Sequence, residues 1–375
     1  MEKVKNPNES WQVFAGTATG GYHIYNKLAC EDASYAKTAS SYRILAAADG
    51  HGAPYCFRAE RGSRFAVQAA REVLQKVRQE SLAQDITRWF AEIRLQENLC
   101  GNIARWLVAR WQQLVREDLK DHPLTVSELR KSGLSYAQAN DPVMQTLFYG
   151  TTLLCALITD QFCLILQQGD GRAITVSKDG DILMPVPWDE RCKGSLTTSL
   201  CDEDAAQSMR WYFAAGDDMP AGVFLCSDGV ENSFKNQEEF IAFIRDFLLD
   251  ASAQPDTLTA DSIHMIEEFA MHRSRDDVSL AFAFRQGAAA ALRNRLNQEK
   301  QLDTIKAELS RVRMEMHRLS DRKNHFEEEG NQEGARRCLH QYYECFRRKE
   351  QLRVTYETEK RRLCRIIHQK RQVLA

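Results

Sequence analysis

The strongest constraint on this sequence is a short apolar run that ends in an acid flanked by glycine. Residues 44–48 read Ile-Leu-Ala-Ala-Ala, and Asp49, Gly50, His51 and Gly52 follow directly. A run of small and branched apolar residues bounded by a turn signal predicts a buried strand. The acid then lies at the strand tip, and the glycines let a ligand approach the backbone closely. Alone, such a pattern more often marks an ordinary turn, so its weight depends on similar stretches elsewhere.

Two further acids stand next to apolar strands. The run 223–226 leads through a serine into Asp228, and Asp276 stands just before the run 278–284. Hard oxygen ligands, with few histidines and no paired thiols, favour Mg²⁺ or Mn²⁺ over Zn²⁺. Two such ions that share a carboxylate can hold a hydroxide and bind the oxygens of a phosphate undergoing in-line displacement. Together with Asp49, these acids therefore predict a metal site for phosphate chemistry.

The rest of the first 286 residues alternates between strand and helix signals. Strands are predicted at 11–17, 150–158, 162–167 and 173–176, with the last three forming a meander through a turn at 169–172. Helices are predicted at 61–78, 85–117 and about 124–140. Many antiparallel strands with separate helices are typical of an α+β fold.

From about residue 288 onward the pattern changes to long helices. Apolar residues recur at alternating three- and four-residue steps: Leu302, Ile305, Leu309, Val312, Met316, Leu319 and Phe326. This is a heptad seam, which the run 327–334 interrupts. A second helix from about 335 is expected to carry Leu339, Tyr342, Phe346, Tyr356, Leu363 and Ile367 on its seam. We expect an antiparallel coiled-coil hairpin, and its interleaved acids and bases argue against nucleic-acid binding.

The charge distribution divides the chain at the same place. Residues 286–375 carry 21 Lys/Arg and 13 Asp/Glu, a net +8, whereas the remainder carries 29 Lys/Arg and 39 Asp/Glu, a net −10. We expect a catalytic domain at 1–286 and a helical tail at 287–375. Two helices alone bury little apolar surface, so residues 288–375 are expected to self-associate or to bind a helical protein partner.

The cysteines and the hydropathy indicate where the protein works. Its eleven cysteines include no Cys-x-x-Cys pair, and several lie inside strand-like runs, as reduced core thiols do. No window approaches 18 uncharged apolar residues, and the first residues lack the apolar core of a secretory signal. We expect a cytoplasmic protein that binds no membrane.

The ordered motifs resemble those of the metal-dependent protein phosphatases of the protein phosphatase 2C (PPM) type, in particular a bacterial branch. The resemblance covers residues from about 11 to 285. It rests on Glu31-Asp32, Asp49-Gly50-His51-Gly52, Gly150-Thr151-Thr152, Gly169-Asp170-Gly171-Arg172, Ser227-Asp228-Gly229 and Asp276-Asp277-Val278-Ser279. It implies a β-sandwich of two antiparallel sheets flanked by helices. The implied activity is hydrolysis of phosphoserine or phosphothreonine in a phosphorylated protein substrate.

The resemblance also implies a role for each motif residue. Two Mn²⁺ or Mg²⁺ ions would be bridged by Asp49. Asp228 and Asp276 would complete the first metal site. The Gly50 carbonyl would bind the second ion, with Glu31 and Asp32 acting there partly through water. His51 matches the residue proposed as the general acid toward the leaving hydroxyl.

Three positions depart from the family pattern. Lys27 stands where the family often has a phosphate-binding arginine, and a lysine binds phosphate only as a point charge. Asn232 replaces an acid that some members use for a third metal, which leaves Asp170 as the available ligand for a weak third ion. Asp277 occupies a position often held by asparagine, and we expect it to orient its neighbours.

Two alternative functions share these motifs. A catalytically silent PPM-like scaffold could act through its coiled-coil tail, but neighbouring carboxylates repel each other unless metals are present, which argues against a retired site. A small-molecule phosphomonoesterase would use every metal ligand named above. Only a substrate screen separates it from a protein phosphatase.

Overall fold

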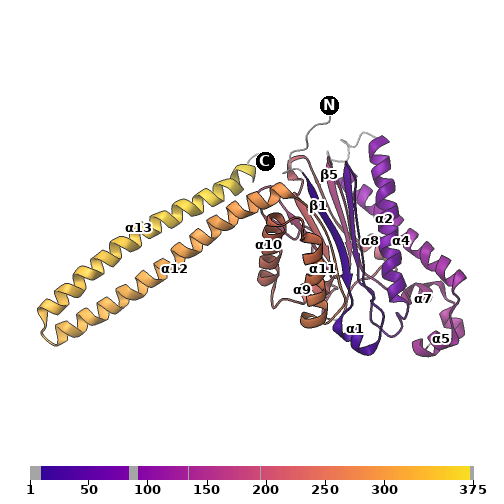
Figure 1. Cartoon of the computed structure of the whole chain (residues 1–375), viewed down its shortest axis with the longest axis horizontal. Helices are drawn as coiled ribbons and strands as arrows, with labels where there is room; N and C mark the ends of the chain where they lie inside the picture. Colours follow the sequence, from indigo (N-terminus) through magenta and orange to yellow (C-terminus); the bar gives the residue numbers. More distant parts are fainter. Residues whose placement is uncertain (1–9, 84–91, 134, 195, 372–375) are drawn as a thin grey trace. The chain divides into compact units, whose positions relative to one another are not determined.

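The computed structural model describes residues 10–83, 92–133, 135–194 and 196–371 (Figure 1). The helix expected at 85–117 therefore lies partly outside the described residues. The chain divides into two compact units, 1–290 and 291–375.

The first unit is built on two antiparallel sheets of five strands each. One sheet has the order β1 (Trp11–Ala18), β10 (Val278–Arg285), β9 (Gly222–Cys226), β6 (Arg172–Val176) and β7 (Ile182–Leu183). The other has the order β2 (Ala33–Thr38), β3 (Tyr42–Ala48), β4 (Leu153–Thr159), β5 (Phe162–Gln168) and β8 (Arg210–Ala215). The predicted α+β sandwich is confirmed.

Strand β3 is buried on both faces, which explains its unbroken apolar run. Side chains alternate along a strand. Ile44, Ala46 and Ala48 therefore face a core shared with helices, whereas Leu45 and Ala47 face the core between the two sheets.

The predicted meander at residues 150–176 is wrong. Strands β4 and β5 pair as expected, but β6 pairs with β9 in the other sheet. The chain crosses between the sheets at the turn 169–171, where Gly169 has a φ of 103°. This crossing carries Asp170 to the end of the sandwich.

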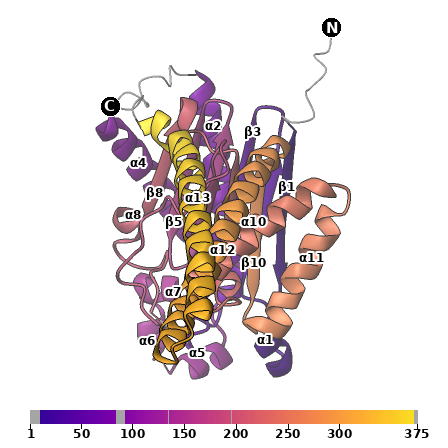
Figure 2. The same ribbon diagram turned by 90° about the vertical axis from the view of Figure 1, so that its left-hand side faces the viewer.

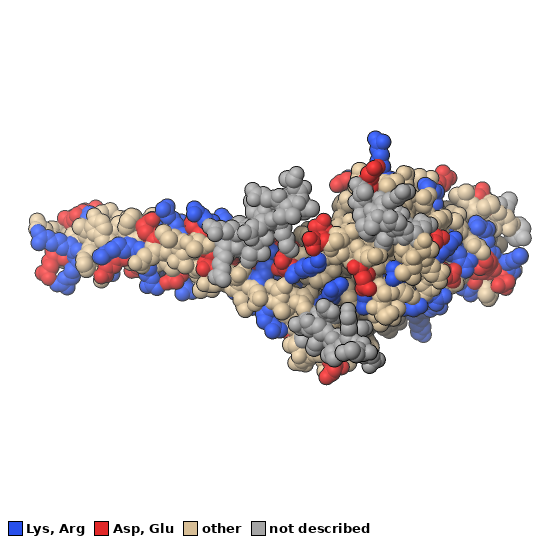
Figure 3. All heavy atoms as spheres, turned by 90° about the horizontal axis from the view of Figure 1, so that it is seen from above, with Lys and Arg blue, Asp and Glu red and all other residues tan. Residues whose placement is uncertain are grey.

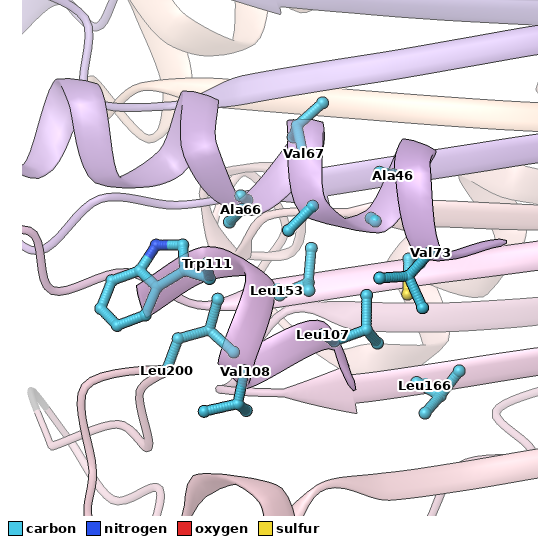
Figure 4. Close-up of a cluster of buried hydrophobic side chains, with 14 of the residues drawn as sticks. Ala46, Ala66, Val67, Val73, Leu107, Val108, Trp111, Leu153, Leu166 and Leu200 are labelled. Carbon is cyan, nitrogen blue, oxygen red and sulfur yellow. The ribbon is translucent and has the colours of Figure 1, made fainter. Parts of the chain in front are cut away.

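Helices cover both outer faces of the sandwich. Helices α2 (Ala59–Ala83) and α4 (Ile93–Asp121) lie on the sheet that contains β3, while α10 (Gln237–Ala253) and α11 (Leu258–Glu268) lie on the opposite side (Figure 1). Figure 4 shows part of the core that these helices share with the sheet. One buried cluster contains Ala66, Val67 and Val73 of α2, Leu107, Val108 and Trp111 of α4, and Ala46, Leu153, Leu166 and Leu200. On the other side Phe247 of α10 packs edge-on against Phe224 and Phe282 of the sheet.

Short helices gather at one end of the sheets. They include α1 (Gly21–Asn26), α5 (Val126–Ser132), α6 (Tyr136–Ala139) and α7 (Pro142–Leu147) (Figures 1 and 2). The single helix expected at about 124–140 is wrong, because α5 ends at Gly133 with a φ of 71° and a new N-cap at Ser135 starts α6. Two further short helices, α8 (Ala205–Ser208) and α9 (Asp228–Glu231), complete this unit.

The second unit is a helical hairpin, as predicted. Helix α12 (Gln286–Glu328) and helix α13 (Gln332–Arg371) are joined by a turn at Gly330, and Arg348 of α13 donates a hydrogen bond to Glu308 of α12. Figure 3 shows acids and bases interspersed along the visible face of the hairpin. Leu302, Ile305, Val312, Met316 and Leu319 are buried, as the heptad pattern predicted.

The predicted seam of α13 is wrong at two positions. Cys338 is buried, whereas Leu339 and Phe346 are exposed. The apolar pattern of α13 fits two adjacent helix faces, and the face of Cys338 is the one that packs. The side chains of Leu363 and Ile367 lie outside the described residues.

The described cysteines are free thiols and most are buried, consistent with the expected reduced state. Among the residues that the structure describes, no helix has the length and apolar character needed to cross a bilayer.

A partly buried ionic network joins Arg58, which immediately precedes α2, to α4 and α5. Arg58 donates to both carboxylate oxygens of Glu128, at 2.7 and 3.1 Å, and to the Tyr149 hydroxyl at 2.7 Å. Tyr149 in turn donates to Asp118 at 2.6 Å. Partial burial raises the pKa of Glu128, but the hydrogen bonds from Arg58 outweigh it and lower that pKa to about 2. Tyr149 immediately precedes the motif Gly150-Thr151-Thr152, so this network fixes the start of that motif.

We predict that Arg58→Ala destabilises the protein by about 2–3 kcal/mol, because it leaves the partly buried Glu128 without the cation that binds both of its oxygens and removes a donor to the buried Tyr149, while Asp118 keeps its pair with Arg61. The matched control is Arg64→Ala, which removes an exposed arginine paired with Glu60 on the same helix, and it should cost less than about 1 kcal/mol. Urea denaturation of both variants measures the difference. Equal losses would contradict a special role for Arg58.

Candidate active site

The backbone around Asp49 continues the pairing of β3 with β4. The Asp49 N–H donates to Thr152 Oγ1 at 3.0 Å, and the Thr152 N–H donates back to the Asp49 carbonyl at 2.8 Å. The His51 N–H donates to the Gly150 carbonyl at 3.0 Å. Residues 150–152 thus act as a backbone clamp that fixes where the Asp49 and His51 side chains begin.

Gly50 is required by close packing. Its N–H donates to the Glu31 carbonyl at 3.1 Å, and a Cβ placed on it would lie 2.6 Å from that same oxygen. The Ala59 carbonyl oxygen would be 2.9 Å away on another side. Only glycine allows the segment that carries Glu31 to approach Asp49 so closely.

Asp277 holds the N-terminal loop against the same site. Its two carboxylate oxygens accept from the Gly20 N–H and the Glu31 N–H, each at 2.6 Å. His23 Nδ1 lies 2.8 Å from Asp277 Oδ2. The structure therefore supports the expected orienting role, since both oxygens of Asp277 are occupied by its neighbours.

Two other acids are held by side-chain donors. Asp32 is buried and accepts from Ser279 Oγ at 2.6 Å. Asp228, at the start of α9, accepts from Asn232 Nδ2 at 2.9 Å. Asn232 therefore supports Asp228.

These elements enclose a cleft of about 670 Å³ at one end of the sandwich. Its lining includes Glu31, Asp49, Gly50, His51, Thr152, Asp170, Asp202, Asp228, Asp276 and Asp277. The predicted residues therefore converge, with two exceptions. Asp32 lies buried behind the lining, and Lys27 is an exposed residue at the end of α1 that is not part of it. Within the described residues, the lining contains no lysine or arginine.

The crowding of acids raises their pKa values. Burial raises the pKa of Glu31 to about 8, with Asp277 and Asp276 adding to the shift. Burial also raises the pKa of Asp228 to about 6, helped by Asp170. The pKa of Asp49 is raised by burial first and then by Asp32 and Asp228. Each charged carboxylate is disfavoured here unless a cation compensates it.

His51 has the opposite shift. Burial lowers the pKa of its imidazole to about 4, and Asp170 opposes that shift only in part. In the protein alone, His51 is therefore neutral near pH 7, and it can donate one ring N–H.

The donor set fits hard divalent cations. Carboxylate oxygens and the Gly50 carbonyl are the ligand types that Mg²⁺ and Mn²⁺ prefer. Among the described residues, no group of three or more acidic, histidine or cysteine side chains is arranged so that it could hold a metal ion as it stands. Metal binding would therefore need the acid side chains to rotate on their fixed backbone.

A sequence model described as Protein phosphatase 2C matches residues 19–262, which is more than half of the chain. The chain belongs to the protein phosphatase 2C family. This agrees with the resemblance inferred from the motifs. A comparison with curated proteins gave no match.

Solved structures with similar folds include several phosphatases. Serine/threonine phosphatase Stp1 from Staphylococcus aureus is 18% identical, with a TM-score of 0.41 and coverage of 73% of this chain and 95% of that one. PppA, from Pseudomonas aeruginosa, is 14% identical, with a TM-score of 0.44 and coverage of 73% and 97%. RsbX in complex with magnesium is 14% identical, with a TM-score of 0.38 and coverage of 76% and 99%.

Sequence reasoning missed two residues that line this cleft, His23 and Asp202. His23 lies inside a short helix, and no neighbouring pattern marks it. Asp202 follows a loop whose Leu200 N–H donates to the Thr151 carbonyl at 2.9 Å. That long-range contact brings Asp202 into the cleft, and no local sequence pattern predicts this position.

The raised pKa of Glu31 makes the stability of the metal-free protein depend on pH. Glu31 binds its proton more tightly in the folded state than in the unfolded chain, so protonation stabilises the fold and deprotonation removes that contribution. Stability with a chelator should therefore fall by about 1–2 kcal/mol from pH 6.5 to 8.5. Urea denaturation at both pH values measures it. Glu31→Gln should reduce the fall, the remainder coming from other acids of the cleft such as Asp49, whose pKa is also raised. Mn²⁺ should restore stability at pH 8.5, and a rise with pH in the wild type would contradict the assignment.

Proposed function

We propose that this protein is a metal-dependent serine/threonine protein phosphatase. The observation that carries the proposal is the cleft itself, which gathers at least six acids and, in its described lining, no cationic side chain. A phosphate dianion would be repelled from such a cleft unless cations entered first. A site of this family with this charge is therefore suited to phosphate only when it holds divalent metal.

Two bound Mn²⁺ or Mg²⁺ ions would supply positive charge to the phosphate and an activated hydroxide to attack it. Asp49, fixed by the backbone clamp at 150–152, would hold the position between them. Asp228 and Asp276 would complete one site, and the Gly50 carbonyl and Glu31 the other. Asp32, which accepts from Ser279, would act at the second site through water.

His51 would serve as the general acid. Its pKa of about 4 keeps it neutral in the protein alone, but a phosphate dianion beside it would raise that pKa, because a nearby negative charge favours imidazolium. The proton would then pass from the ring to the leaving serine or threonine oxygen.

Asp170 and Lys27 would have secondary roles at the site. Asp170 would hold a weak third ion, since it lines the cleft and its charge acts on Asp228. Lys27 is exposed and outside the lining, so its contact with phosphate would require the side chain to reach in from the rim.

We also propose that residues 1–286 form the catalytic domain and that 287–375 form a tail for protein partners. The compact units meet at 290 and 291, four residues later than the proposed boundary. The proposed location is the cytoplasm, and the proposed substrate is a phosphorylated protein.

The deciding experiment removes metal with a chelator and then adds Mn²⁺ or Mg²⁺ while phosphate release is measured. The substrates are a phosphothreonine peptide and a panel of small phosphomonoesters. Metal-restored activity that favours the peptide supports the proposal. Activity only on small esters supports a phosphomonoesterase, and no activity with either metal supports a silent scaffold.

We predict that Asp49→Asn reduces hydrolysis to background. A neutral amide removes negative charge from between the two dications and should empty at least one metal site. Phosphate release at saturating Mn²⁺ measures the loss. Retention of more than about a tenth of wild-type turnover, a barrier change below about 1.4 kcal/mol, would contradict the bridging role.

For His51→Ala we predict a loss that depends on the leaving group. A serine or threonine oxygen needs a proton as it leaves, whereas an activated aryl phosphate does not. Turnover of the phosphothreonine peptide should therefore fall at least about tenfold more than turnover of the aryl ester. Equal losses would instead indicate a structural role for His51.

A further inference from the structure

Two arginines and a tryptophan lie together at the end of the sandwich opposite the cleft. Arg43 and Arg285 alternate along β3 and β10 with Leu45 and Ala283, which face the core between the two sheets. Their side chains therefore point between the sheets as well. Both guanidinium groups lie over the indole ring of Trp11, at 4.7 Å from its centre for Arg43 and 5.2 Å for Arg285. The two positive charges are thus neighbours.

Little negative charge balances this pair. Within the described residues, neither guanidinium group donates a hydrogen bond, and the Nε atoms of Arg43 and Arg285 are buried without an acceptor. The one carboxylate that pairs with them there is Asp160, whose Oδ1 lies 3.9 Å from Arg43 Nη1, beyond hydrogen-bond length. The side chain of Asp160 is 63% exposed, whereas that of Arg43 is 9% exposed. Asp160 is therefore a weak and screened partner.

The environment disfavours the charge of Arg43. Burial lowers the pKa of Arg43, and although Asp160 opposes that shift, the charge of Arg285 adds to it. Arginine nevertheless stays protonated in proteins, so the positive charge remains. Buried N–H groups without an acceptor call for a partner. An anion would supply both the acceptor oxygens and the missing charge.

We propose that Arg43 and Arg285 bind the phosphate group of a small molecule, either inorganic phosphate or a phosphomonoester. One guanidinium group can donate two parallel hydrogen bonds to phosphate oxygens. Two such groups match the charge of a phosphate dianion, whereas a monocarboxylate balances only one. Arg285 and Trp11 are partly exposed, which leaves the site open to solvent. This inference does not depend on the proposed phosphatase activity.

The arginine pair is separate from the cleft. Strand β3 begins beside Arg43 and leads to Asp49 after its other end, about 20 Å away at 3.3 Å per residue. The cleft gathers acids and, in its described lining, has no lysine or arginine, so without metal it repels phosphate. Phosphate binding by the metal-free protein therefore reports on the arginine pair.

The test titrates inorganic phosphate by calorimetry into the full-length protein, freed of metal by dialysis and kept at constant ionic strength with chloride. Arg285→Gln removes one charge of the pair at a partly exposed position. Its matched control is Arg71→Gln. Arg71 also lies over an aromatic ring, 5.9 Å from the centre of Tyr35, but it has an acid beside it, Glu72 at 3.8 Å. Glucose 6-phosphate and acetate are titrated in the same way.

We expect one phosphate per wild-type chain, and binding at least about tenfold weaker in Arg285→Gln. Arg71→Gln should change affinity by less than about twofold, and acetate should bind at least about tenfold more weakly than phosphate. Arg285→Lys keeps the charge but not the forked donor, so its affinity should be intermediate. Equal binding of phosphate and glucose 6-phosphate would show that the phosphate group alone is recognised, and binding of the ester only would identify a phosphomonoester as the ligand.

The variants should fold, because Arg285 donates no hydrogen bond within the described residues. Thermal unfolding without phosphate checks this, and the midpoint of Arg285→Gln should equal or exceed that of the wild type, since a like-charge neighbour has been removed.

Three outcomes would overturn the proposal. Absence of saturable phosphate binding to the wild type would exclude the site. Equal weakening by Arg285→Gln and Arg71→Gln would indicate attraction to overall charge. Phosphate binding by Asp160→Asn or by Glu9→Gln, but not by the wild type, would show that an acid of this chain already balances the pair.

Discussion

The main constraint on this structure is the mutual repulsion of the carboxylates that it holds in one cleft. Asp49, Asp228, Asp276 and Glu31 come from distant parts of the chain, and burial together with their neighbours raises the pKa of each. Left to itself, such a group would move apart or take up protons. The fold limits the separation of these carboxylates, because their backbone is fixed and their side chains can only rotate. Divalent cations would compensate the negative charge, so the carboxylates would no longer need to take up protons.

Backbone fixation comes in layers that lead away from the cleft. Residues 150–152 clamp Asp49 and His51, and Tyr149 just before them is held by Arg58. Gly62 of α2 allows the Tyr149 carbonyl to pack against it, since a Cβ there would lie 1.9 Å from that oxygen. On the other side Asp277 fixes Glu31 and the loop at Gly20. Function at the cleft thus rests on contacts made by residues at or near α2, α4 and α5, which lie outside the cleft lining.

The sequence predicted the parts of this design that are local. The run 44–48 is apolar because β3 is buried on both faces, and an acid at its tip has to lie at the end of a sheet. The predictions that failed concern features that depend on contacts with distant parts of the chain. The turn at 169–171 looks like a hairpin, but β6 finds β9 in the other sheet. Leu339 and Phe346 fit a heptad as well as Cys338 does, and only packing against α12 selects the seam. Asp202 and His23 join the cleft through long-range contacts that leave no local pattern.

The central claim is that the cleft binds two divalent ions bridged by Asp49. Calorimetric titration of Mn²⁺ into metal-free protein tests it most directly, with wild type and Asp49→Asn compared at the same pH. The account predicts two ions per chain for the wild type and at most one for the variant. Absence of binding to the wild type, or the same stoichiometry in both proteins, would contradict it.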